Sequence, residues 1–281
     1  MAADLAGRTA ILFKVLALAP AVIIGIPAQA LAIRFGSSLQ TRLPVLFHRY
    51  ACHVLGVRLT IEGMRPKDMP GLKDTPVLIA SNHVSWLDII VLGSVMPLSF
   101  IAKAEVATWP IFGALARLQR TVFVDRQRRT ATSAVNDVVA ERLNTGDVMV
   151  LFGEGTTSDG SRVLPFRSAL LGAARAALGK SDSPVYIQPL SIGYTRRHGL
   201  PMGRADRPFI AWYGDMELLP HLGAILAGGP VDVTVCFGEP ISCSLHTDRK
   251  ELAARVEKIV RSGLNCSITG RAKFDGEREA A

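Results

Sequence analysis

The chain carries a histidine and an aspartate five residues apart in the segment Ala80-Ser-Asn-His-Val-Ser-Trp-Leu-Asp88. An apolar stretch precedes this segment and a helical pattern follows it, which predicts His83 in a loop and Asp88 in the first helical turn, with Ser85 as the helix cap. A carboxylate on one imidazole nitrogen fixes the tautomer and leaves the other nitrogen free to take a proton. The pair therefore predicts a general base. Taken alone, it is also compatible with a hydrogen-bonded loop histidine beside an aspartate that favours the helix dipole.

The nucleophile for such a base is expected to come from outside the chain. No serine stands in a Gly-x-Ser-x-Gly elbow, and none of the four cysteines has a distinctive setting. The base would therefore draw its proton from a substrate hydroxyl or from water. The cysteines also form no C-x-x-C pair and no zinc spacing, so we expect no metal site and a reduced, cytosol-facing protein.

A second cluster lies in Val148-Met-Val-Leu-Phe-Gly-Glu-Gly-Thr-Thr-Ser-Asp159, where an apolar strand runs into a glycine-rich acidic loop. Gly153 and Gly155 allow the backbone to approach a ligand closely. Glu154 at a strand end is a good acceptor for hydroxyl or ammonium groups. The loop predicts a ligand cradle, although a plain turn is the alternative. It lacks the Gly-Lys-Ser/Thr ending of a nucleotide-binding P-loop.

A third cluster is basic and flanks the short strand predicted at 121–125. Its members can hold a phosphate or carboxylate, can face anionic lipid, or can form an ordinary solvated surface. They are Arg117, Arg120, Arg126, Arg128 and Arg129.

The elements that must position these residues alternate between strands and helices. Strands are predicted at 57–62, 76–81, 99–103, 121–125, 148–152, 185–194 and 231–237. Helices are predicted at 86–95, 130–143, 169–178, 217–227 and 248–262. This order predicts an α/β fold with a mostly parallel sheet covered by helices on both faces, in which reactive groups collect at the strand ends.

The first 56 residues are predicted to form membrane-associated helices. Val15 to Ile33 is an uncharged, nearly all-apolar run, which reaches about 28 Å as a helix and matches the hydrocarbon thickness of a bilayer. Pro20 and Pro27 leave open whether it spans the membrane or re-enters it. A signal peptide cleaved after Ala30 is the rival interpretation. The amphipathic segment at 39–57 covers the core or lies on lipid headgroups.

Composition limits the partners. The 281 residues hold 32 Lys plus Arg against 24 Asp plus Glu, a net charge of +8, and 49% hydrophobic residues. Such a chain is globular and its partner anionic: nucleic acid, an acidic membrane surface, or a phosphorylated or carrier-bound substrate. Nucleic acid is disfavoured because the aromatic content is only 6% and no aromatics interleave the basic residues. We expect the catalytic domain at 57–265 and a polar tail at 266–281.

Four motifs occur in a fixed order: His83 to Asp88 in Asn-His-x-x-x-x-Asp, Phe123 to Arg126 in Phe-x-x-Arg, Glu154 to Thr156 in Glu-Gly-Thr, and Ile187 to Leu190 in Ile-Gln-Pro-Leu. Together they resemble the four blocks of the glycerolipid acyltransferase family that includes lysophosphatidate acyltransferase. The resemblance covers about residues 76 to 194. It implies transfer of a fatty acyl chain from a thioester of acyl-carrier protein or coenzyme A to a lipid hydroxyl at a membrane surface, with no other cofactor and no metal.

The resemblance also implies roles for individual residues. His83 would be the base, Asp88 its partner, and the second and third blocks, with Arg126, Glu154 and Gly155-Thr156, the acceptor site. Lys103 matches a position where related enzymes commonly carry lysine, and we expect it to help stabilise the oxyanion.

Three departures bear on the acceptor. Arg120 stands where the family's second block usually opens with Gly, and Gly153 and Thr157 replace the Pro and Arg of the usual Phe-Pro-Glu-Gly-Thr-Arg. Losing that Arg removes a forked donor suited to a phosphate monoester.

Segments 158–160, 194–203 and 211–216 resemble instead the branch that acylates lyso-ornithine lipid. That acceptor presents an ammonium, which Asp159 and Glu154 could meet, and a carboxylate, which Arg126 or Arg162 could meet. Lysophosphatidate acylation, a non-catalytic lipid-binding protein and an exported hydrolase are the alternatives. We expect a protein on the cytoplasmic side of the inner membrane, with acyl-carrier protein, a lysolipid and anionic lipid as partners.

Overall fold

The computed structural model describes residues 2–72, 75–124, 129–168, 178, 184–244 and 246–270. The α-helices in these ranges are α1 (Ala2–Arg34), α2 (Leu39–Leu55), α3 (Leu87–Val95), α4 (Phe112–Leu118), α5 (Arg129–Asn144), α7 (Leu218–Ala227) and α8 (Arg249–Thr269). The strands are β1 (Val57–Glu62), β2 (Val77–Ser81), β3 (Ser99–Lys103), β4 (Val122–Val124), β5 (Met149–Phe152), β6 (Val185–Arg197), β7 (Leu200–Pro201), β8 (Val231–Phe237) and β9 (Ile241–Cys243).

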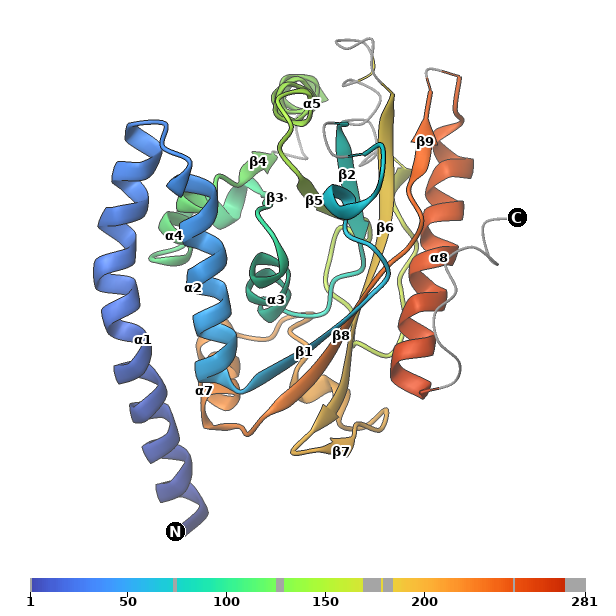
Figure 1. Cartoon of the computed structure of the whole chain (residues 1–281). Coiled ribbons are helices and arrows are strands. Elements are labelled where there is room, and N and C mark those ends of the chain that lie inside the picture. Colours follow the sequence, from blue (N-terminus) through green and yellow to red (C-terminus); the bar gives the residue numbers. More distant parts are fainter. Residues whose placement is uncertain are drawn as a thin grey trace.

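The strands form one sheet in the order β1-β8-β6-β2-β5-β3-β4, with β7 and β9 paired to β6. Strands β6, β2, β5, β3 and β4 all run parallel. Strand β8 is antiparallel to β6 and parallel to β1. The sheet is therefore mostly parallel, as the alternating pattern predicts, and the carboxyl ends of five strands share one edge (Figure 1).

Helices cover both faces of the sheet, because the strands at its centre are apolar on both sides. In β2, Leu78 and Ala80 pack with α5 and α8, through residues such as Leu143 and Val256. Ile79, on the opposite face, packs with α2, α3 and α7. The period-two alternation of a strand thus divides the core into two layers and fixes which way each loop leaves the sheet.

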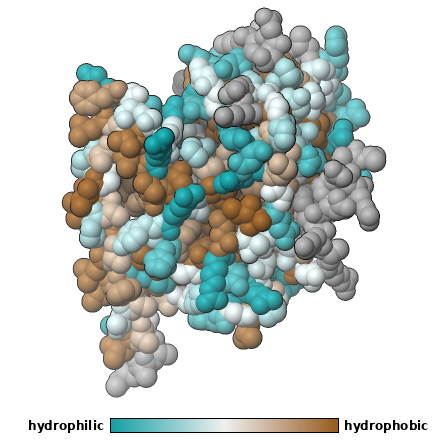
Figure 2. Space-filling model, in the orientation of Figure 1, coloured by the Kyte–Doolittle hydropathy of each residue, from teal (hydrophilic) through white to brown (hydrophobic). Residues whose placement is uncertain are grey.

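Helix α1 is one continuous helix that includes both Pro20 and Pro27. It is long and apolar enough to cross a membrane from Leu5 to Arg34, which indicates membrane association. Figure 2 shows brown, hydrophobic residues along its length at the left of the view. Its exposed side chains include Leu12, Phe13 and Leu16.

Side-chain hydrogen bonds hold α1 to the rest of the chain, and one of them runs from Lys14 Nζ to the Gly228 carbonyl at 2.9 Å. The Gln29 amide donates hydrogen bonds to the carbonyls of Gln40 and Leu118, each within 2.9 Å. The Tyr50 hydroxyl donates to the Ala17 carbonyl at 2.8 Å. The Ala28-Gln29-Ala30 sequence thus lies inside a helix that is packed on the domain.

Helix α2 covers the core through Val45, His48, Ala51, Cys52 and Leu55, all buried; contact of its exposed face with lipid headgroups stays a prediction. Two features differ from the sequence expectation: α4 and the short strands β7 and β9 were not predicted, and α8 continues through Thr269, past the expected start of the polar tail. The helix expected at 169–178, except Leu178, and the tail residues 271–281 lie outside the described ranges.

Candidate active site

The candidate residues meet at the carboxyl edge of the parallel strands. His83 follows β2, Glu154 follows β5, and Lys103 ends β3. The register brings these ends to one level, since Ser81 pairs with Phe152 and Ile101 pairs with Leu151. Segments distant in sequence therefore converge on one small region, as parallel sheets require.

His83 and Asp88 are in direct contact. The His83 Nδ1 lies 2.8 Å from Asp88 Oδ2. Asp88 is fully buried, while the His83 side chain keeps 19% of its surface exposed. A buried carboxylate on Nδ1 places the proton there and leaves Nε2 with a free lone pair. The imidazole is thus oriented from the protein side and accessible on the other.

Asp88 itself is held by three further donors. Its Oδ2 accepts the backbone N–H groups of Val84, at 2.7 Å, and Ser85, at 3.0 Å. Its Oδ1 accepts the Tyr194 hydroxyl at 2.7 Å. The predicted Ser85 cap does not form; α3 begins at Leu87, and the Ser85 hydroxyl has no hydrogen-bond partner. The Asp88 carboxylate satisfies the orphan N–H groups of this turn in its place.

Tyr194 is a member of this constellation that the sequence reasoning did not single out. It lies on β6, is fully enclosed, and burial followed by the charge of Asp88 raises the pKa of its phenol well above the ordinary value. The neutral hydroxyl therefore remains a donor to Asp88. The available signal is a tyrosine near the end of a strand in which most residues are buried.

The position of the His83 ring is also fixed by Phe152 and by the loop after β5. The His83 ring stacks on Phe152 with a centroid distance of 3.7 Å and an angle of 10°. Its backbone N–H donates to Glu154 Oε1 at 2.9 Å, and its carbonyl accepts the Ser158 N–H at 2.8 Å. The glycine-rich loop thus clamps the histidine loop.

Glu154 ties this loop together. Its Oε1 accepts from His83 and its Oε2 accepts the Leu164 N–H at 2.9 Å. Burial raises the pKa of its carboxyl to about 7, although the two backbone donors favour the carboxylate. The side chain is 2% exposed, so its observed role is structural, and a contact with an acceptor ammonium stays a prediction.

Comparison with known proteins indicates the same family as the four sequence motifs. Residues 58–193 match the acyltransferase domain family. A lyso-ornithine lipid O-acyltransferase of Brucella abortus is 49% identical over 247 residues, or 88% of this chain and 90% of that protein. The lyso-ornithine lipid O-acyltransferase of Rhizobium meliloti is 43% identical, over 91% and 86%. The chain belongs to the acyltransferase family.

More distant relatives broaden the family. A 1-acyl-sn-glycerol-3-phosphate acyltransferase of Neisseria meningitidis is 33% identical over 66% of this chain and 68% of its own. The crystal structure of the 1-acyl-sn-glycerophosphate acyltransferase PlsC from Thermotoga maritima has the same fold, with a TM-score of 0.64, 22% identity and coverage of 97% and 99%.

A second residue that sequence reasoning passed over joins β2 to β6 in this acyltransferase. The Asn82 side chain donates to the Ile192 carbonyl at 2.9 Å and accepts the Ile192 N–H at 2.8 Å. Asn82 is fully buried. It continues the ladder one residue beyond the strand and so fixes where the chain turns towards His83.

The remaining predicted residues of the acyltransferase surround the pair with varied exposure. Gly155 is buried with φ of +72°, a conformation that favours glycine. Thr156, Arg162 and Lys103 are exposed, and Asp159 is half-buried. No hydrogen bond within the described ranges joins Lys103 to His83. Arg126 lies outside the described residues.

Arg207, which the sequence analysis did not single out, is a basic residue near the loop that carries His83. Gly160 approaches both Val84 and Arg207, which places Arg207 beside the loop that carries His83. Burial lowers the pKa of its guanidinium, and the charge of Asp159 opposes this. Its Nε is buried without a partner.

Proposed function

We propose that this acyltransferase moves a fatty acyl chain from an acyl thioester to the hydroxyl of lyso-ornithine lipid, forming ornithine lipid. The observation that carries the chemistry is the 2.8 Å contact of the part-exposed His83 with the buried Asp88. The names of the two relatives that share 49% and 43% of their aligned residues support the choice of acceptor.

In this reaction His83 Nε2 takes the proton from the acceptor hydroxyl as its oxygen attacks the thioester carbonyl carbon. The tetrahedral intermediate collapses, the carbon–sulfur bond breaks, and the thiolate takes the proton from the imidazolium. Asp88 stabilises the imidazolium between these steps. Base catalysis of this kind supplies about a hundred- to ten-thousandfold. Positioning and oxyanion stabilisation, for which we propose Lys103, supply the rest.

The acceptor site we propose is the loop 154–162 with Arg126. Thr157 replaces the forked donor that suits a phosphate monoester. Asp159 and Glu154 are assigned to the ammonium of the acceptor, and Arg162 or Arg126 to its carboxylate. Arg207, beside Asp159, adds a positive charge at the same place.

The experiment that tests the acceptor compares two lysolipids. Purified full-length protein in detergent is given labelled acyl-carrier protein with either lyso-ornithine lipid or lysophosphatidate. We expect transfer to the first at least tenfold faster. The Neisseria relatives favour lysophosphatidate as the second candidate, and faster transfer to it would reverse the assignment. Coenzyme A thioester in a parallel reaction identifies the donor.

The experiment that tests the base replaces His83 with Ala. We expect transfer to fall by at least a hundredfold in protein that remains folded, because no other described base lies beside Asp88. Turnover by the His83→Ala variant at the wild-type rate would refute the base assignment. If the wild-type protein itself binds lipid but transfers no acyl chain, it is a non-catalytic lipid-binding protein.

The proposed location is the cytoplasmic side of the inner membrane, where acyl-carrier protein and anionic lipid are both accessible. The apolar α1 supports membrane attachment. Mass spectrometry of lipids from cells with and without the protein tests the role in the cell. Lyso-ornithine lipid should accumulate in its absence.

A further inference from the structure

A basic cavity lies at the edge of the sheet opposite to His83. Its volume is about 430 Å³, and it is bordered by the starts of β3 and β5, at Ser99 and Val148, and by α2. Strand β3, with five residues, and strand β5, with four, cross the sheet from this edge to the catalytic edge, a distance of about 13–17 Å. The cavity is therefore separate from the site described above.

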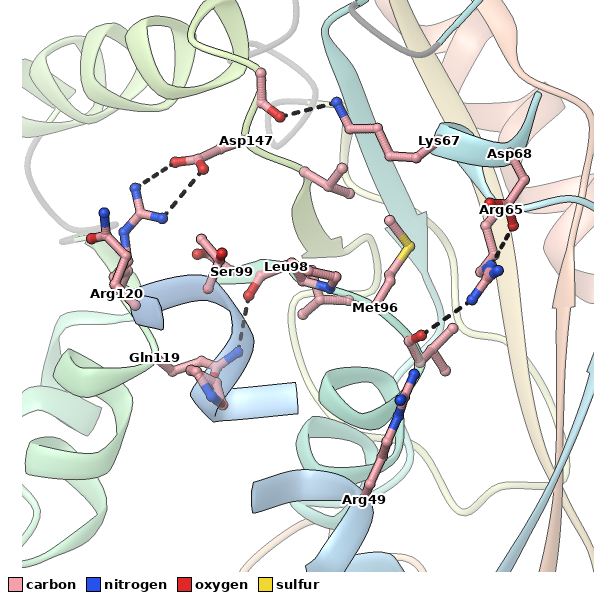
Figure 3. A pocket seen from close by; sticks show the side chains of 17 residues that line it. Arg49, Arg65, Lys67, Asp68, Met96, Leu98, Ser99, Gln119, Arg120 and Asp147 are labelled. Atoms are coloured by element: carbon pink, nitrogen blue, oxygen red, sulfur yellow. Dashed lines mark hydrogen bonds and ion pairs between the residues drawn. The ribbon is translucent and has the colours of Figure 1, made fainter. Parts of the chain in front are cut away.

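Its charged lining is net positive. Four cations, Arg49, Arg65, Lys67 and Arg120, share the wall with two carboxylates, Asp68 and Asp147. Figure 3 shows Arg49 and Arg65 on one side of the cavity and Arg120 with Asp147 on the other.

Asp147 is already neutralised. It pairs with Arg120 and with Arg142, each at 2.8 Å. Arg120 makes this pair from a left-handed backbone with φ of +59°, at the position where the family usually carries Gly. Both terminal amino groups of Arg120 are bound to the Asp147 carboxylate. With Arg142 on the same carboxylate, the group keeps an excess of one positive charge.

Arg49 and Arg65 keep donor capacity for a ligand. Arg49 Nε donates to the Ser94 carbonyl at 2.9 Å, at the carboxyl end of α3. Arg65 donates to the Val95 carbonyl at 3.4 Å, and its Nε is paired with Asp68 at 2.5 Å, so fewer of its donors are left than those of Arg49. Within the described part of the chain, the two terminal amino groups of Arg49 have no acceptor. A guanidinium fixed at Nε presents these groups as a fork for a phosphate or carboxylate.

A trough of about 340 Å³ adjoins the cavity and shares Arg49, Arg65 and Val95 with it. The other residues that line the trough are mainly apolar but include His53 and Ser94. Leu59 and Ile61 of β1 line the trough, and Ile61 is 42% exposed. The cationic cavity complements the anionic headgroup of a lipid, and the adjoining trough complements part of its acyl chain.

The position of the cavity points to the membrane as the source. Gln40, Thr41 and Pro44 on its rim belong to α2. They follow Phe35, just after the membrane-associated α1, and Leu39, the first residue of α2, which are 77% and 48% exposed. We propose that the cavity binds the anionic headgroup of a membrane lipid and that the trough takes up part of its acyl chain.

The test measures lipid retention by the full chain in a neutral detergent, using native mass spectrometry. Phosphatidylglycerol is the anionic probe and phosphatidylcholine with the same chains is the neutral one. We expect Arg49→Gln and Arg65→Gln each to weaken phosphatidylglycerol binding about tenfold, the size of one charge-assisted contact, without affecting phosphatidylcholine. Arg249→Gln, the same change at an exposed residue of α8, should have no effect. Equal binding by all four proteins would overturn the proposal.

Two further measurements identify the source of the anion. Ile61→Ser should weaken phosphatidylglycerol binding but not the binding of inorganic phosphate, because only the lipid has a chain in the trough. If phosphate alone binds as tightly as the lipid and Ile61→Ser changes nothing, the cavity takes a free anion and the lipid assignment is wrong. His83→Ala should leave lipid retention unchanged; a loss there would show that the measured lipid occupies the catalytic edge.

Discussion

At the residue scale, the pair of His83 and Asp88 gains its properties from groups that hold the carboxylate. One oxygen receives three donors and the other receives Tyr194. A buried carboxylate with four donors keeps one position, and so the imidazole keeps one orientation.

Asp88→Asn tests the charge separately from the geometry. The asparagine oxygen can take the place of Oδ2, and its amide can face the Tyr194 hydroxyl, so the fold should survive. We expect transfer to fall about a hundred- to ten-thousandfold because the imidazolium loses its counter-charge. Steady-state kinetics and a thermal melt measure both effects. An active variant would show that the charge is dispensable.

Tyr194→Phe is the complementary change. It removes one donor from Asp88 Oδ1 and leaves that oxygen buried, which costs about 1–3 kcal/mol of unfolding free energy. Transfer should fall less than in Asp88→Asn because the charge remains. Denaturant unfolding measures the first effect. A variant as stable as wild type would mean that water replaces the hydroxyl.

Glu154 predicts a pH dependence of stability. Its carboxyl has a pKa of about 7 in the folded chain against 4.5 ordinarily, so the folded state binds the proton more tightly. The stabilisation is complete below the unfolded pKa and is lost as the pH rises through 7, a change of roughly 3 kcal/mol. In Glu154→Gln, the free energy of unfolding should no longer fall between the unfolded pKa of 4.5 and pH 7. Glu239→Gln, at an exposed position, should keep this dependence on pH. Parallel curves for wild type and Glu154→Gln would contradict the pKa.

At the element scale, the loop after β5 depends on a glycine where the family usually carries proline. A Cβ on Gly153 would stand 2.4 Å from the Phe166 ring, so the loop and the ring could not both keep their places. The backbone of Gly153 is held beside the Phe166 ring because its N–H donates to the Ser81 carbonyl and its carbonyl accepts the Arg167 N–H.

Gly153→Ala should therefore lower transfer by tenfold or more by displacing the loop that clamps His83, with a fall in thermal stability. Gly223→Ala in α7 is the matched control, because a Cβ there meets nothing within 4 Å and alanine favours a helix over glycine by about 0.5–1 kcal/mol. The transfer rate and melting temperature of both variants are compared with those of the wild type. An unaffected Gly153→Ala would show that Phe166 yields without cost.

At the scale of the whole molecule, the chain divides its apolar residues between a two-layered core and the outer surface of α1. Leu12, Phe13 and Leu16 are 59%, 70% and 62% exposed. Each of these side chains gains about 1.5–3 kcal/mol when it leaves water for an apolar phase.

Replacing these three residues with Ser should shift the protein from the membrane pellet to the supernatant, while transfer to detergent-dispersed lysolipid continues. Leu200→Ser, at a residue of β7 that is 71% exposed, should not change the distribution. Ultracentrifugation of lysates followed by activity assay measures this. Unchanged membrane association of the triple variant would assign attachment to another surface.

The sequence by itself determined the class of fold, the order of the central elements, and the contact between His83 and Asp88. These follow from local rules: the period of apolar residues distinguishes strand from helix, and five residues across a loop and one helical turn keep two side chains within reach. The ordered motifs added the family, which the comparisons confirmed.

Only the tertiary structure decided the rest. Tyr194 and Asn82 act across 106 and 110 residues of sequence, and the cavity at the opposite edge collects its four cations from α2, the 65–67 segment and the turn after α4. Such sets depend on which strands become neighbours in the sheet, and the pairing of distant strands leaves no period in the sequence. The same holds for Glu154, whose pKa is set by burial between two loops.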